Sequence, residues 1–66
     1  MIDVETRARL IQEICQGLVG DAHRLPQVRE TAHKYVCLAI RWAILHNKKG
    51  LAEILSGYSL QIAEMH

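Results

Sequence analysis

The feature that most constrains the fold is the segment YVCLAIRWAIL, from Tyr35 to Leu45, in which ten of eleven residues are apolar and the exception is Arg41. On a helical wheel of 100° per residue, the apolar residues of this region cover most of the circle. One narrow polar stripe remains, which holds Glu30, Lys34, Arg41 and Lys48. We therefore expect the Arg41 stem to lie along apolar neighbours while its guanidinium reaches water.

Two stretches, residues 17–26 and 47–50, interrupt the helical pattern and divide the chain into three segments. Apolar residues recur every three or four positions in each segment, which predicts helices over residues 4–18, 26–46 and 51–64 and no strand. Asp3 suits the N-cap of the first helix, and Pro26 suits the first position of the second. The spacing predicts an all-α fold: a three-helix bundle, or a helical hairpin with a short third helix.

Details of the outer helices follow from the same spacing. In the first, Leu10 and Ile14 widen the apolar stripe, and Glu5 and Arg9 are placed to form a surface pair four residues apart. In the third, Gly57 is a weak point, because a glycine inside a helix costs about 1 kcal/mol relative to alanine. We expect either a bend at Gly57 or the close approach of another backbone there.

The chain has 66 residues, half of them hydrophobic, which predicts one globular domain over residues 1–66, near the lower size limit for independent folding. Two neighbouring helices can cover one broad face of the second helix but not a face this wide. We expect an open apolar edge at Leu38, Trp42 and Leu45, and at its border the cations Lys34, Arg41 and Lys48.

A second copy of the chain would cover this edge, so we predict a homodimeric helical bundle with Trp42 and Leu45 at the subunit contact. Two alternatives stay open. In one, loops and end residues of a monomer cover the edge. In the other, the edge is a groove for a different protein.

The charge balance gives little attraction to nucleic acid or to membrane surfaces, since the net charge is +1. No stretch approaches the ~18 apolar residues of a membrane span, and the first residues do not resemble a secretion signal. We predict a cytoplasmic protein with no membrane association.

The two cysteines, Cys15 and Cys37, are too few for a disulfide framework, and we expect both to be reduced and mostly buried. His33 and Cys37 have a spacing that can chelate a metal, with Cys15 and His23 as further ligands. Such a pair is common by chance, so we predict no metal site and no cofactor. Cys37 and His33 could also be a nucleophile and its base, but nothing nearby would orient the base, so we predict no catalytic residue and no enzyme.

One motif gives an alternative function. The stretch LAEILSGYSLQIAEM, residues 51–65, resembles a helix-turn-helix pattern with Ser56-Gly57 as the turn, which implies a DNA-binding regulator. The second half of the stretch has no Lys or Arg and carries Glu64, which repels phosphate, and the regular spacing through Tyr58 also fits a single helix. The primary prediction is a small non-enzymatic interaction module, an adaptor, chaperone-like partner or protein inhibitor, that binds itself and another protein through apolar helix faces.

Overall fold

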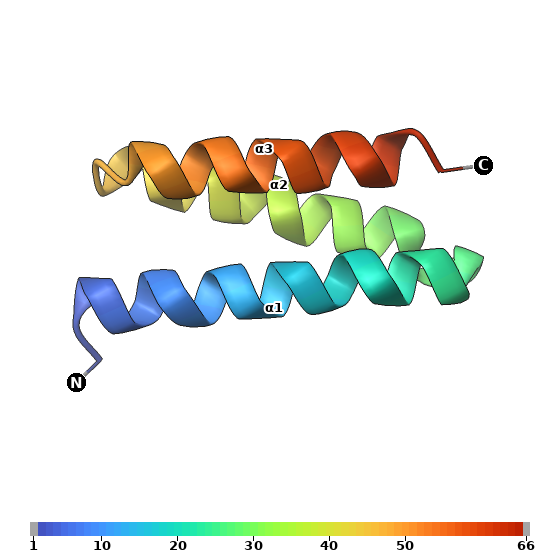
Figure 1. Ribbon diagram of the computed structural model, residues 1–66, viewed down its shortest axis with the longest axis horizontal. Helices are drawn as coiled ribbons and strands as arrows, with labels where there is room; N and C mark the ends of the chain where they lie inside the picture. Colours follow the sequence, from blue (N-terminus) through green and yellow to red (C-terminus); the bar gives the residue numbers. More distant parts are fainter. Residues whose placement is uncertain (1, 66) are drawn as a thin grey trace.

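The computed structural model describes residues 2–65 and folds them into three α-helices that lie side by side (Figure 1). Helix α1 spans Val4–Arg24, α2 spans Arg29–Leu45 and α3 spans Lys49–Ala63, with a 3₁₀ turn, η1, over Pro26–Val28. Residues 2–65 contain no strand, and every helix contacts both of the others. The predicted all-α, three-helix arrangement is therefore confirmed, while the first and last residues of the predicted domain lie outside the described residues.

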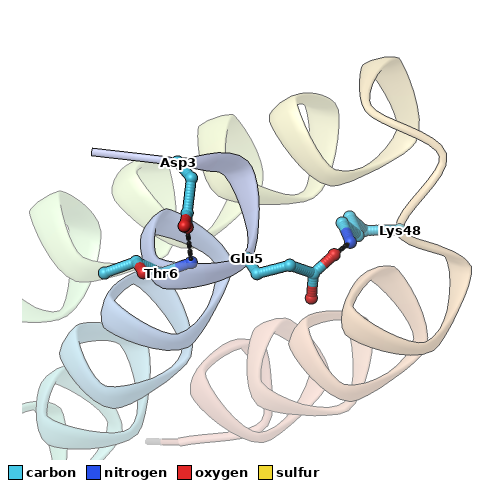
Figure 2. Close-up of polar contacts among 4 residues, drawn as sticks. All are labelled: Asp3, Glu5, Thr6 and Lys48. Carbon is cyan, nitrogen blue, oxygen red and sulfur yellow. Dashed lines mark hydrogen bonds and ion pairs between the residues drawn. The ribbon is translucent and has the colours of Figure 1, made fainter. Parts of the chain in front are cut away.

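Helix α1 begins with the predicted cap. The Asp3 carboxylate accepts a hydrogen bond of 2.7 Å from the backbone N–H of Thr6 (Figure 2). This hydrogen bond lowers the pKa of the Asp3 carboxyl below its usual value. At neutral pH the cap is therefore a charged carboxylate, which also interacts favourably with the positive end of the helix dipole.

The predicted end of α1 at residue 18 is wrong, because the helix continues through Gly17 and Gly20 to Arg24. The added turns bring Val19 and Ala22 into the core, and this burial outweighs the glycines' low helix propensity. The helix stops at Leu25, whose backbone is extended at φ −127° and ψ 90°. A residue that precedes proline disfavours helical geometry, so Pro26 sets this end.

The connection between α2 and α3 is a tight helix C-cap. Asn47 has a left-handed backbone with φ 58°, and its N–H donates to the Ile44 carbonyl at 3.2 Å. The next N–H, of Lys48, donates to the Ala43 carbonyl at 2.8 Å. These two bonds satisfy carbonyls at the end of α2 and reverse the chain direction, so that α3 begins at Lys49, two residues before its predicted start.

The core is small and made largely of small side chains. Helix α2 contributes one larger residue, Val36, and three alanines, Ala32, Ala39 and Ala43, to the buried set. The nine buried residues among residues 2–65 are Cys15, Ala22, Ala32, Val36, Ala39, Ala43, Leu51, Leu55 and Ile62. The large apolar side chains of α2 therefore lie mostly outside the buried core.

Gly57 lies within an unbroken α3, and a Cβ atom added there would meet nothing within 4 Å. No other backbone approaches closely enough to require a glycine. We predict that Gly57→Ala raises the free energy of unfolding by about 0.5–1 kcal/mol, because alanine loses less backbone entropy in a helix. Urea denaturation followed by circular dichroism measures the change.

Leu55→Ala provides the opposite reference, because Leu55 is fully buried and its truncation should lower the free energy of unfolding by about 2–5 kcal/mol. If Gly57→Ala also destabilised the protein, α3 would not be the continuous helix described here.

Candidate functional site

The predicted docking edge is formed by apolar side chains on the outer side of α2. Leu38 is 61 % exposed and Leu45 is 75 % exposed, whereas Trp42 is half-buried and packs against the core. The Trp42 indole lies beside the His46 imidazole, with ring centroids 4.4 Å apart. The edge therefore consists of two exposed leucines beside the ring of Trp42, whose position is fixed by its packing against the core.

Two of the three predicted border cations lie beside this edge. Lys34 and Arg41 are exposed, and together with Leu38 they line a shallow hollow on the outer side of α2. The Lys34 ammonium lies 3.4 Å from the Glu30 carboxylate, four residues earlier on the same helix. Both partners are exposed, so this pair adds little stability and leaves Lys34 free to reorient.

Lys48 lies elsewhere. Because α2 ends at Leu45, Lys48 is in the connection to α3, and its ammonium forms an ion pair with Glu5 at the start of α1 (Figure 2). Glu5 thus pairs across the bundle and not with Arg9, the partner expected from spacing. The wheel misplaced Lys48 because it continued α2 through Asn47, where the chain turns.

A groove between α1 and α2 adjoins the edge, and sequence reasoning missed it. Its lining residues are Arg7, Ile11, Tyr35, Leu38, Ala39 and Trp42. Helical spacing places Leu10 and Ile14 on the same flank of α1 as Arg7, and they are 42 % and 48 % exposed. The apolar surface therefore extends across two helices.

We call this surface the α1–α2 face and define it by Leu10, Ile14, Tyr35, Leu38, Trp42 and Leu45. The sequence signal for the α1 part of this face is the apolar stripe of α1, which is wider than one neighbouring helix could cover.

The two cysteines occupy different environments. Cys15 is fully buried, as expected, but Cys37 is exposed, so the prediction that both are buried is wrong for Cys37. Position 37 lies one residue before Leu38 and hence about 100° around the helix, on the side that faces α3. Neither thiol forms a disulfide. Burial in an apolar core raises the pKa of the Cys15 thiol to about 11.

Cys37 has polar neighbours on two helices. Its sulfur lies 3.9 Å from Nδ1 of His33 and 4.0 Å from the Ser59 hydroxyl, and the Ser59 oxygen lies 3.0 Å from Nε2 of His33. The two residues that could have supplied further metal ligands do not join this pair: Cys15 is in the core and His23 is near the end of α1. Across residues 2–65, no group of three or more His, Cys, Asp or Glu side chains could hold a metal ion.

The helix-turn-helix alternative depends on a turn at Ser56-Gly57, and α3 has none there. The helix runs from Lys49 to Ala63 without a break, and the Ser56 hydroxyl donates to the Ala52 carbonyl four residues back. In place of two helices meeting at an angle, residues 51–63 form one helix whose buried side holds Leu51, Leu55 and Ile62.

Comparisons with protein-family models, with curated proteins and with solved structures find no significant match to this chain. Within residues 2–65, no helix is both long enough and apolar enough to cross a membrane.

The raised pKa of Cys15 predicts a pH dependence of stability. We expect the free energy of unfolding to fall as pH rises from about 9 to about 11, because the thiol ionises near its ordinary value of 9.0 in the unfolded chain but stays protonated in the fold until about 11. The stabilisation that comes from keeping the Cys15 thiol protonated in the fold is fully present below pH 9 and lost above pH 11. Urea denaturation across this pH range measures it, with Cys15→Ala as the reference that lacks it.

An equal slope in wild type and Cys15→Ala would contradict this prediction. Thiol labelling at neutral pH offers an independent check, since Cys37 should react in the folded protein and Cys15 only after unfolding.

Proposed function

We propose that this chain is a small non-enzymatic protein–protein interaction module that acts through apolar helix faces, and that a second copy of the chain is its first partner. The observation that carries the proposal is the pair of exposed leucines, Leu38 and Leu45, beside the half-buried Trp42 on α2. Clustered large apolar side chains on a small monomer are typical of an interaction surface.

The residue types of the edge support this proposal. Interfaces are enriched in aromatic residues and arginine, and the residues that dominate binding energy are often Trp, Tyr and Arg. Here Trp42 and Tyr35 lie among leucines, and Arg41 lies at the border. The net charge of +1 means that two copies repel each other only weakly.

The dimensions also fit. A standard interface buries about 800 Å² per partner, which is about a sixth of the 4717 Å² accessible surface of this chain. The Cα atoms extend over 35 × 20 × 14 Å, so one side of the bundle is long enough to supply that area. A second copy could therefore cover the edge without rearrangement of the helices.

The small core gives a second reason for association. In a chain of this size a single core rarely supplies more than about 3–5 kcal/mol of stability, and four of the nine buried residues here are alanines. A partner that binds only the folded chain stabilises it by mass action. A different protein with a similar apolar helix could bind the same edge, as for an adaptor, a chaperone-like partner or an inhibitor. We place this function in the cytoplasm, where both free thiols would stay reduced.

Leu45→Glu should dissociate the proposed dimer, because it puts a charge into an apolar contact while the side chain makes little contribution to the core. We expect the dissociation constant to rise by at least about tenfold, equivalent to 1.4 kcal/mol, with the helices still formed by circular dichroism. Sedimentation equilibrium over micromolar concentrations measures this. Trp42, the only tryptophan, should shift its emission to longer wavelength as the wild type is diluted.

Leu60→Glu is the matched control, because Leu60 on α3 is as exposed as Leu38, at 61 %, and is absent from the α1–α2 face. It should leave the dimer intact. A wild type that is monomeric at high micromolar concentration would refute self-association, and unfolding by Leu45→Glu would show that Leu45 belongs to the core.

A further inference from the structure

The α1–α2 face is wider than the α2 edge on which the proposed function rests, and we infer that two copies meet across it in an antiparallel twofold arrangement. In this arrangement Ile14 lies near the twofold axis, and Arg7 of each copy lies opposite Asp21 of the other. The inference presupposes self-association and adds which surface is used and in which orientation.

The first argument is shape. The groove between α1 and α2 is lined mainly by apolar residues, including Ile11, Tyr35 and Trp42. Leu10 and Ile14 project from the same side of the molecule and remain about half exposed. In a twofold contact each copy presents the same patch, so the side chains beside the groove of one copy can pack over the groove of the other. Groove and projecting side chains on one face make it self-complementary.

The second argument is charge. Arg7, Ile14 and Asp21 are each seven residues apart, so they form a nearly straight row along α1, with about 10 Å between successive members. Arg7 is exposed and forms no ion pair within residues 2–65. Asp21 binds Arg24 at 2.5 Å through one carboxylate oxygen, which leaves the other oxygen as an acceptor.

This row selects the orientation. An antiparallel contact centred on Ile14 brings Arg7 of each copy opposite Asp21 of the other, and symmetry makes two such pairs. A parallel contact would instead place the two Arg7 side chains together and the two Asp21 side chains together, and like charges in register disfavour association. Charge pairing therefore favours the antiparallel twofold over the parallel one.

Gly17 agrees with this geometry. Leu10 and Gly17 form a second row seven residues apart, so the same antiparallel contact brings Leu10 of one copy near Gly17 of the other. Within the monomer a Cβ atom at Gly17 would meet nothing within 4 Å, so the fold itself does not require a glycine there. A position without a side chain opposite Leu10 lets the two α1 helices approach closely.

A charge exchange tests the arrangement. Arg7→Asp and Asp21→Arg, made separately, each place like charges opposite one another at two symmetric sites, and each should raise the dissociation constant of the dimer by about fivefold to tenfold at low salt. The double variant restores opposite charges and should return the constant to within about twofold of wild type. Sedimentation equilibrium measures all four proteins, and circular dichroism confirms that each is folded.

Matched controls lie away from the α1–α2 face. Arg9→Asp, on the side of α1 that faces the start of α3, and Glu53→Arg, on α3, reverse the same charges at exposed positions, and they should change the dissociation constant by less than about twofold. If the row variants behave like these controls, or the double variant is not restored, while Leu45→Glu still dissociates the dimer, the proposed function stands and the antiparallel arrangement is wrong. A monomeric wild type would overturn both, and the α1–α2 face would then be assigned to a different protein.

Discussion

The packing of α2 through small side chains is the constraint on which the rest of this structure depends. Three alanines and one valine make up the buried side of α2, and Ala22 of α1 adds another small residue to the core. Small side chains at a helix contact allow the axes to approach closely, but each one buries little apolar area. The helices can therefore pack closely but bury little apolar surface, and several of the larger apolar residues lie outside the core.

That distribution explains the α1–α2 face. Leu38 and Leu45 on α2 and Leu10 and Ile14 on α1 are all larger than the alanines of the buried side, yet each is at least about two-fifths exposed. Exchanging the two sets would give a fuller core and less exposed apolar surface. The observed arrangement instead leaves the apolar area where a partner can reach it, which is the physical basis of the proposed interaction.

The sequence predicted those parts of the fold that depend on local chemistry. The periodicity gave three helices, Asp3 gave the cap of α1, and the apolar circumference of α2 predicted exposed leucines at positions 38 and 45. Predictions that required the path of the chain between helices were less successful. The helical wheel places Lys48 on the stripe of Arg41 because it takes no account of the chain reversal at Asn47. The two glycines predict too early an end for α1 because the tertiary contacts of Val19 and Ala22 outweigh their low helix propensity.

The α1 half of the face shows a second limit of sequence reasoning. Helical spacing identified Leu10 and Ile14 as part of one apolar stripe, but not which part of the stripe the neighbouring helices cover. That depends on where α2 and α3 lie around α1: α2 lies on the side of Arg7 and Ile11, and α3 on the side of Ala8 and Gln12. The same difficulty applies to Cys37, which has an apolar side chain and lies in an apolar segment, yet is exposed beside α3. Burial within a bundle is a property of three helices together.

A thin core and an exposed apolar face together link folding to binding. In the proposed dimer each copy would remove from water apolar surface that a single chain leaves exposed, so the stability of the folded chain should depend on its own concentration. A different protein that offers a comparable apolar helix would compete for the same surface, because the hydrophobic contribution has no directional preference. On this proposal, Arg7 and Asp21 on α1 and the cations Lys34 and Arg41 on α2 would select among such partners, because their charges penalise a partner in the wrong orientation or of the wrong charge. In this reading the apolar residues supply the affinity, and the few charged residues at their border determine which partner is bound.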